Sequence, residues 1–315
     1  MIDLERCLHR PLLPALASLF ALLACSGAST PVPLASGESA PFALAVQASS
    51  LYWLVPAQTG VPGALRTVST QGGAAKTLSG VNAPRSLALS AQAAFVGSGD
   101  GNVYSIPIAG GEPRVLIAKD GSGAAVAISV SGGYLYATFN AGRIARIALT
   151  DGATVEELPA VTDTVTLFAA DGAFIYWATS DGNLWREASD GSGDATLLGN
   201  TGGDAPTQPA FLRGSLYFRG TGYLGSVEEA SGKVATLLEG TKTWSLASNG
   251  ASLYLGLVHG IGSLEPPSST ASLFVSLEVA GSVLAADGSN VYWISGAVDA
   301  FGNPTAQRTI YRGKI

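Results

Sequence analysis

Short runs of hydrophobic and polar residues, four to seven residues long, recur along most of the chain, and glycine-rich connections separate them. The pattern is clearest in the middle of the chain, with runs at 126–130, 134–139, 143–149 and 155–158. The connections between them read Ser-Gly-Gly, Asn-Ala-Gly and Asp-Gly, which is the chemistry of tight turns. Each run therefore predicts a β-strand, and four consecutive runs predict one antiparallel sheet.

An aromatic residue marks the second run of each such unit, and it recurs at regular intervals. The seven positions are Tyr52, Phe95, Tyr136, Tyr176, Tyr217, Tyr254 and Tyr292, at spacings of 43, 41, 40, 41, 37 and 38 residues. A repeat of about forty residues with four strands is the pattern of a β-propeller blade. Helical periodicity is absent after the first 25 residues. We therefore predict an all-β fold, a seven-bladed β-propeller with four-stranded blades.

The two ends of the repeat region predict how the ring closes. The seventh repeat has only three runs, at 283–286, 291–295 and 309–314. Residues 36–41 (Ser-Gly-Glu-Ser-Ala-Pro) parallel residues 79–84 (Ser-Gly-Val-Asn-Ala-Pro), so residues 32–36 match the last strand of a blade. An N-terminal strand that completes the C-terminal blade would remove an open sheet edge. Residues 32–315 are then a single β-propeller domain.

The N-terminal 25 residues have the features of a secretory leader. Basic residues precede an apolar stretch from Pro11 to Ala24, which is too short to span a bilayer as a helix but suits a signal peptide. The stretch ends in Leu22-Leu23-Ala24-Cys25, which resembles the lipobox of bacterial lipoproteins. The alternative is an ordinary cleaved signal in which Cys25 has no role.

The lipobox resemblance implies a location as well as an anchor. In that family the cysteine becomes the lipidated N-terminus, so residues 1–25 would be a lipoprotein signal peptide and residues 26–31 a short tether. Position 26 is Ser rather than Asp. By resemblance to the sorting rule of these lipoproteins, that residue implies the outer membrane of the bacterial cell envelope, on its periplasmic or surface face.

Tyr-Trp pairs at 52–53, 176–177 and 292–293 carry a second resemblance. They resemble the repeats of YWTD and NHL-type β-propellers, and of bacterial lipoproteins built from such repeats. The resemblance covers nearly all of residues 32–315 as a pattern. It implies a binding or scaffolding role more often than chemistry.

Composition and charge restrict the classes of function. Hydrophobic residues make up 47% of the chain and charged residues 13%, which excludes a disordered protein. Net charge is −6 without any basic cluster, so we expect no nucleic-acid partner. We expect a monomer whose only membrane contact is the lipid anchor.

The inventory of reactive residues argues against enzymatic catalysis. The only cysteines, Cys7 and Cys25, lie in the leader, and His259 is the only histidine after it. Nucleophilic catalysis and a zinc site both need more such groups than this. The segment 190–194 superficially resembles a calcium loop but lacks the Gly and the final Glu of an EF-hand. We expect this segment, like the other Asp-Gly pairs, to form turns.

The aromatic residues admit two interpretations. The recurring Tyr and Trp residues are expected to fill the space between twisted neighbouring blades. The rival interpretation is an aromatic platform for a sugar, to which Trp185 and Trp244 are better suited, because both lie outside the Tyr-Trp pattern.

Polar residues at the expected channel mouth are the first candidate site. The loops that lead from one blade to the next carry Glu38, Asn82, Asp163, Asp204 and Lys242. Converging oxygen ligands there would hold Ca²⁺ or Mg²⁺, as in metal-dependent lactonase-like or lyase-like propeller enzymes. We favour the alternative that these are solvated turn residues, because turns alone select Asp and Asn. We therefore expect no cofactor.

Two insertions are the second candidate site. Residues 56–63 and 296–305 lengthen the connection between the second and third strands of the first and last repeats. Ring closure makes these repeats neighbours, and long loops on a rigid scaffold concentrate binding residues. Asp299, Phe301 and Asn303 are the expected contacts. The function predicted is a lipid-anchored envelope propeller that binds a protein, a glycan or an envelope component without catalysis.

Overall fold

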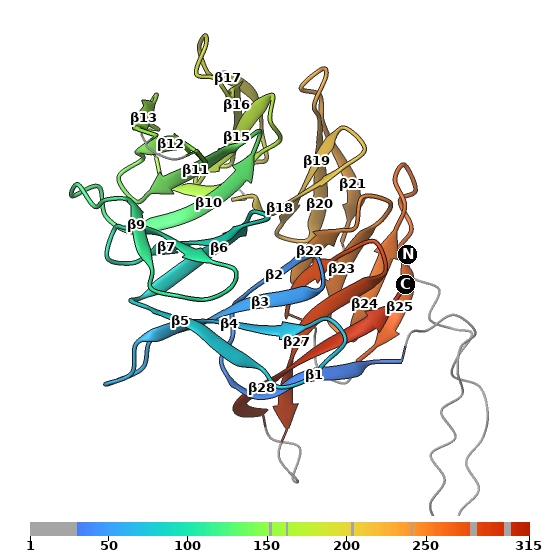
Figure 1. Cartoon of the computed structure of the whole chain (residues 1–315). Coiled ribbons are helices and arrows are strands. Elements are labelled where there is room, and N and C mark those ends of the chain that lie inside the picture. Colours follow the sequence, from blue (N-terminus) through green and yellow to red (C-terminus); the bar gives the residue numbers. More distant parts are fainter. Residues whose placement is uncertain are drawn as a thin grey trace, which may run out of the picture.

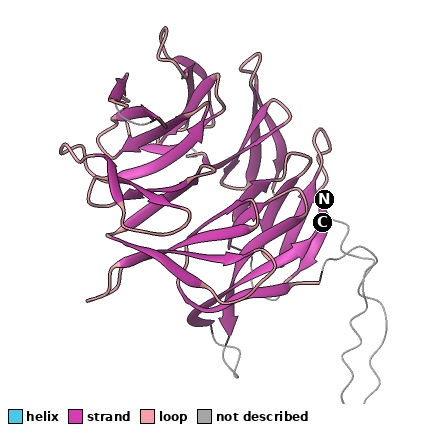
Figure 2. Cartoon of the chain, in the orientation of Figure 1, coloured by secondary structure: helices cyan, strands magenta, loops and turns pink. Residues whose placement is uncertain are grey.

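All regular secondary structure that we describe is β-strand. The computed structural model describes residues 30–150, 153–161, 163–202, 205–240, 242–277, 282–298 and 304–315. These residues form strands β1 to β28 and contain no helix (Figure 2). Accordingly, the described part of the chain holds no helix of the length and apolar character that a membrane span requires.

The strands form seven antiparallel sheets of four strands, which we number as blades 1 to 7 (Figure 1). Blade 1 contains β2 (Ala43–Gln47), β3 (Ser50–Val55), β4 (Gly63–Ser69) and β5 (Lys76–Val81). Blade 2 contains β6 (Pro84–Leu89), β7 (Ala93–Ser98), β8 (Val103–Pro107) and β9 (Arg114–Ile117). Blade 3 contains β10 (Ala125–Ser131), β11 (Tyr134–Phe139), β12 (Ile144–Ala148) and β13 (Val155–Leu158).

The remaining blades repeat this order of strands. Blade 4 contains β14 (Val165–Ala170), β15 (Phe174–Thr179), β16 (Asn183–Ala188) and β17 (Thr196–Asn200). Blade 5 contains β18 (Thr207–Leu212), β19 (Ser215–Gly220), β20 (Tyr223–Glu228) and β21 (Val234–Glu239). Blade 6 contains β22 (Ser245–Ser248), β23 (Leu253–Leu257), β24 (Gly260–Leu264) and β25 (Ser272–Ser276). Blade 7 contains β26 (Ser282–Ala286), β27 (Asn290–Val298), β28 (Pro304–Lys314) and β1 (Val32–Ser39).

The first strands of successive blades contact one another around the whole ring, and β2 contacts β26 where the ring closes. In blade 7 the outermost position belongs to β1, which pairs with β28 from Val32 opposite Arg312 to Ser39 opposite Gln307. Figure 1 shows the blue β1 beside the red β28. The predicted seven-bladed propeller, closed by an N-terminal strand, is therefore confirmed, and that strand is longer than the expected 32–36.

The recurring aromatic residues lie between blades, as expected. All seven are at most 7% exposed. Each packs against the blade that follows: Tyr52 belongs to one hydrophobic cluster with Val96 of blade 2, and Tyr292 to another with Leu51 of blade 1. Because twisted sheets diverge outward, a large ring in each gap contributes to every blade junction.

Repeats 4 and 7 share the segment Ala-Ala-Asp-Gly ahead of their aromatic residue, at 169–172 and 285–288, and its aspartate has the same role in both. The Asp171 carboxylate accepts hydrogen bonds from the backbone N–H groups of Ala173 and Phe174, at 2.8 and 2.7 Å, and from the Tyr176 hydroxyl at 3.1 Å. Burial, followed by the charge of this carboxylate, raises the pKa of Tyr176. Asp287 repeats the arrangement with the Tyr292 hydroxyl at 2.6 Å. These Asp-Gly pairs are turns, as predicted; Asp151-Gly152 lies outside the described residues.

The two insertions differ in structure. Residues 56–62 form an irregular turn with a single bridge between Gln58 and Val61. In blade 7 the described inserted residues, 296–298 and 304–305, continue strands β27 and β28, since Gly296 pairs with Arg308 and Val298 with Pro304. At both ends of the expected loop the chain is therefore paired rather than irregular, because antiparallel pairing satisfies the backbone of both arms beyond the body of the sheet; residues 299–303 lie outside the described residues.

Candidate functional site

One face of the ring collects two kinds of connection. Antiparallel order places the loops from the outermost strand of a blade to the next blade on the same side as the turns between second and third strands. A hydrogen bond from the Gly99 N–H to the Ala83 carbonyl, at 2.7 Å, joins the two kinds in blade 2. We call this side the upper face and the opposite side the lower face.

The structure describes the predicted channel residues only in part, and the site they would form stays a prediction. Asn82, Asp163 and Lys242 are exposed loop residues, and no hydrogen bond or ion pair joins any two of them. Asp204 lies outside the described residues. Within the described ranges, no three His, Cys, Asp or Glu side chains gather closely enough to hold a metal ion.

Glu38 has a different role from the one expected of a channel carboxylate. Its side chain is 5% exposed, accepts a hydrogen bond from Trp53 Nε1 at 2.9 Å and lies 3.1 Å from Arg66 Nε. The reason is that β1 continues to Ser39, which carries Glu38 into the junction between blades 7 and 1. Glu38 therefore fastens the closing strand to blade 1.

Several other predicted residues cannot be placed. Cys25, Asp299, Phe301 and Asn303 all lie outside the described residues. Their proposed roles in lipidation and ligand binding stay predictions.

The two tryptophans considered for a sugar platform differ in their exposure to solvent. Trp185 stacks on Trp177 with an interplanar angle of 8° and packs into the junction of blades 3 and 4, so its face is not free for a sugar. Trp244 is 52% exposed on the upper face, in the loop before β22. Its backbone N–H donates to the Gly256 carbonyl at 2.7 Å, which attaches it to the end of β23. The exposed Val258 follows that strand end.

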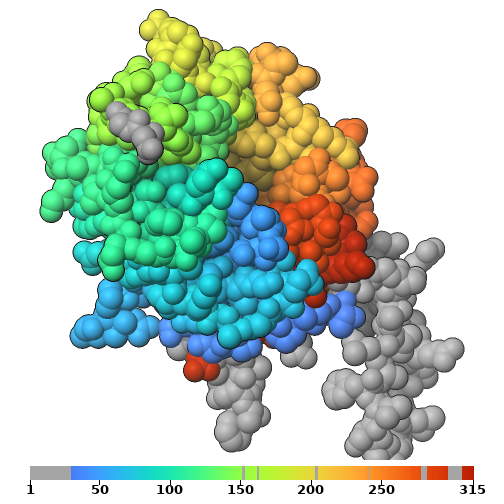
Figure 3. Space-filling model, in the orientation of Figure 1, coloured from blue at the N-terminus to red at the C-terminus, as the bar shows by residue number. Residues whose placement is uncertain are grey.

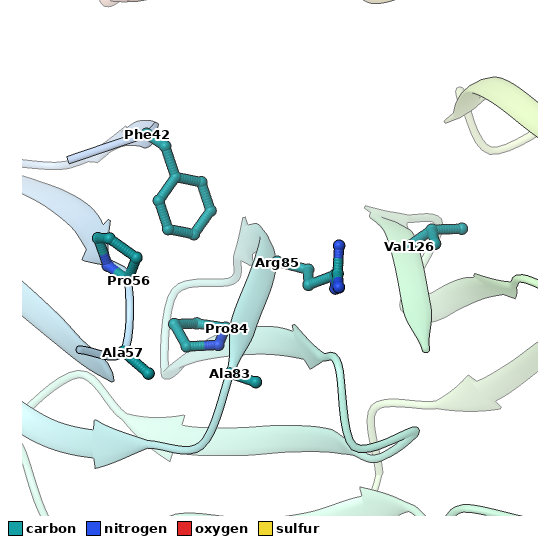
Figure 4. Close-up of a pocket in the computed structure, with 7 residues that line it drawn as sticks. All are labelled: Phe42, Pro56, Ala57, Ala83, Pro84, Arg85 and Val126. Atoms are coloured by element: carbon teal, nitrogen blue, oxygen red, sulfur yellow. The ribbon is translucent and has the colours of Figure 1, made fainter. Parts of the chain in front are cut away.

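A pocket of about 550 Å³ opens on the upper face at blades 1 and 2. Its lining consists of Phe42, Pro56, Ala57, Ala83, Pro84, Arg85 and Val126 (Figure 4). In the view of Figure 4, Phe42 and the two prolines lie on one side, and Arg85 extends from them toward Val126. The segment 56–62, which borders the pocket, projects from the body of the molecule (Figure 3).

Sequence reasoning missed this pocket, although a signal for it exists. Phe42 and Arg85 each follow the parallel segments Ser-Ala-Pro and Asn-Ala-Pro, so they occupy equivalent positions at the start of blades 1 and 2. Both positions carry a large side chain, and both side chains line the pocket. The contribution of Val126 from blade 3 has no such signal.

Charges at the upper face are paired in blade 3 and unpaired at the pocket. Arg143 lies 2.6 Å from Glu157 and 3.1 Å from Asp120. Among the residues that the structure describes, no carboxylate forms an ion pair with Arg85. The pocket therefore presents one uncompensated cation beside an apolar wall.

Comparison with known proteins supports the fold alone. No protein-family model and no curated protein matches the chain. A chain in the crystal structure of the Mitotic Checkpoint Complex is 13% identical with a TM-score of 0.67, and the match covers 96% of this chain and 99% of that one. The WD40 β-propeller domain of Doa1 is 13% identical with a TM-score of 0.64, over 88% and 97% of the two chains.

A designed protein is also similar in structure. The computationally designed Ika8 protein is 14% identical with a TM-score of 0.63, and the match covers 90% of this chain and 98% of that one. The chain is thus a seven-bladed propeller with WD40-like structural neighbours. The resemblances to lipoproteins and to YWTD or NHL repeats stay predictions.

Proposed function

We propose that this protein is a non-enzymatic binding module, held at the bacterial cell envelope by a lipid on Cys25, whose upper face binds a protein partner. The observation that carries the proposal is Trp244, which exposes half of its surface on a rigid scaffold. Tryptophan is the residue type most enriched at the energetic centres of interfaces, and an indole left in water gains much from being covered.

The surroundings of Trp244 favour a protein over a glycan as the partner. The apolar Val258 stands beside the same strand end, and Val61 is 59% exposed on the same face in blade 1. Exposed aliphatic side chains add to the apolar area of a protein interface. The similarity to a chain that belongs to the Mitotic Checkpoint Complex supports the same choice, because that propeller is part of a protein assembly.

The direction of β1 supports an arrangement relative to the membrane. Val32 pairs with Arg312 at the lower end of blade 7, and β1 then runs to the upper face. A tether of residues 26–31 reaches at most about 20 Å when fully extended. Lipid on Cys25 would therefore hold the lower face toward the membrane and leave the upper face available to its partner.

The anchor is tested by replacing Cys25 with Ser and fractionating the cells. A lipid on Cys25 is the sole proposed membrane contact, so the variant should move from the membrane fraction to the soluble fraction. A variant that stays in the membrane fraction like the parent protein would contradict the anchor.

The binding surface is tested by crosslinking the anchored protein to its envelope neighbours and identifying what is captured. We expect Trp244→Ala to lower the yield of a specific partner at least tenfold, the effect of losing about 2 kcal/mol at an interface centre. Leu197→Ala is the matched control, since Leu197 is 50% exposed but lies on the outermost strand of blade 4. Equal yields from the Trp244 variant and the parent protein would place the binding surface elsewhere.

A further inference from the structure

We propose that the pocket at blades 1 and 2 binds an extended acidic peptide segment of the partner, which rests on the proposed function of the upper face. A carboxylate of the peptide pairs with Arg85, and an apolar side chain next to it packs against Phe42, Pro56 and Pro84. The pocket would then recognise a short motif in the partner peptide, in which an acidic residue stands next to an apolar one.

Arg85 differs from three other arginines of this protein in having no carboxylate partner among the described residues. Arg66, Arg143 and Arg146 each form an ion pair with a glutamate. Arg85 has no such pair within the described residues. A Cβ placed on Gly99 would lie only 3.2 Å from Arg85 Nε, so the guanidinium lies close to this glycine, on the turn between β7 and β8. Arg85 therefore brings to the lining of the pocket a charge that no described carboxylate pairs with.

The acidic residue that follows Gly99 in the turn already has hydrogen-bond partners. Asp100, next to Gly99, accepts hydrogen bonds from the Asn102 N–H at 2.9 Å and the Tyr104 hydroxyl at 2.7 Å. Burial opposes ionisation, but these hydrogen bonds outweigh it and lower the pKa of Asp100. The Asp100 carboxylate therefore stabilises its own turn and forms no ion pair with Arg85, so the charge of Arg85 is available to a ligand.

The rest of the lining favours an apolar side chain. Of the seven lining residues, Arg85 is the only charged one, and the others are Phe, Pro, Ala and Val. Proline has no N–H to donate, so the wall offers packing and little competing polarity. A volume of about 550 Å³ lies within the range of pockets that hold small ligands or a few residues of a peptide.

The location of the pocket favours a peptide over a free organic acid. The pocket shares the upper face with Trp244, and the exposed Val61 belongs to the projecting segment 56–62, whose Pro56 and Ala57 line the pocket and give it an apolar border. A free acid would fill the pocket and leave this border in water. An extended chain covers both.

The test is a selection from a displayed library of random heptapeptides on the purified protein and on Arg85→Glu. We expect peptides selected on the parent protein to share an Asp or Glu next to an aromatic, Pro or aliphatic residue. Their affinity should fall about 10- to 100-fold on Arg85→Glu, as expected when a charge-assisted hydrogen bond is lost. Selection on Arg85→Glu should change the acidic position to Lys or Arg.

Arg114→Glu is the matched control, because Arg114 is an exposed arginine of the same blade on its outermost strand. It makes the same change of net charge and should leave the selected motif unchanged. Equal melting temperatures of the three proteins establish that the fold is intact. Selected peptides without an acidic position, peptides that bind Arg85→Glu as well as the parent, or a failure to select any peptide would each overturn the proposal.

These results are separable from the crosslinking experiment. An Arg85-dependent acidic motif with no envelope partner captured would leave the pocket assigned and contradict the wider function. A partner lost with Trp244→Ala but insensitive to Arg85→Glu would contradict only the pocket.

Discussion

Two glutamates are buried at blade junctions, and they differ in the partners that surround their carboxylates. Glu38, between blades 7 and 1, accepts the Trp53 indole N–H and lies beside Arg66. Glu187, between blades 3 and 4, is only 2% exposed, and neither of its carboxylate oxygens has a hydrogen-bond partner within the described structure. Arg146, the cation whose charge acts on Glu187, is engaged with Glu156 and with the Ser189 carbonyl.

The difference teaches what a buried carboxylate contributes in this ring. A buried carboxylate loses its hydration, which destabilises the folded protein. Only hydrogen-bond donors or cations that the fold places beside it offset that loss. Glu38 has such donors at the junction where the two ends of the chain meet. Glu187 lacks them, and burial raises its pKa, while the charge of Arg146 lowers it in part and that of Asp194 raises it further. Glu38 therefore holds a junction together, and Glu187 weakens one.

The largest effect is expected from removing the closing strand. Deletion of residues 26–37 removes most of β1, including the buried Leu34 and Ala35, and exposes the edge of β28. We expect the free energy of unfolding to fall by at least about 4 kcal/mol, from lost burial and lost pairing. Chemical denaturation measures this. An unchanged unfolding midpoint would mean that closure contributes nothing to stability.

A smaller loss is expected from Glu38→Ala. This substitution leaves the buried Trp53 N–H without an acceptor and Arg66 without its counter-charge, which should cost about 2–4 kcal/mol. Glu38→Gln is the matched control: its side-chain oxygen can still accept from Trp53, so it should cost less than half as much. Equal losses for the two substitutions would show that the hydrogen bond to Trp53 is not what stabilises this junction.

The smallest effect has the opposite sign. Glu187→Gln removes a poorly compensated charge, and should raise the free energy of unfolding at pH 7 by roughly 1–2 kcal/mol. The pKa of Glu187 in the folded protein lies above its ordinary value of 4.5. As pH rises through 4.5 the unfolded chain ionises first, so the stability of the parent protein falls until the folded pKa is passed.

The gain from Glu187→Gln should therefore be full at neutral pH and disappear below about pH 4.5, where both states are protonated. Thermal melting of both proteins from pH 4 to pH 8 follows it. A gain that is independent of pH would show that the effect comes from packing rather than from charge.

Sequence patterns predicted most of the architecture because that information is local. The spacing of Tyr52 and its six equivalents counted the blades, and the match between residues 36–41 and 79–84 identified the closing strand. The site was predicted less well. Glu38 was assigned to the channel, since nothing in its own segment shows that β1 extends far enough to turn it toward Trp53. Trp185 and Trp244 could not be told apart, since only the neighbouring blade decides which ring is covered.

The sequence by itself determined the repeating strands, the number of blades and the turns, because alternation of side chains and turn chemistry act between residues close in the chain. Tertiary structure alone decided which buried glutamate has donors and which charges stay unpaired. It also assembled the pocket, whose Phe42, Arg85 and Val126 come from three different blades. The physical reason is that these properties depend on which side chains of neighbouring blades meet, and a pattern along one strand carries no information about the blade that packs against it.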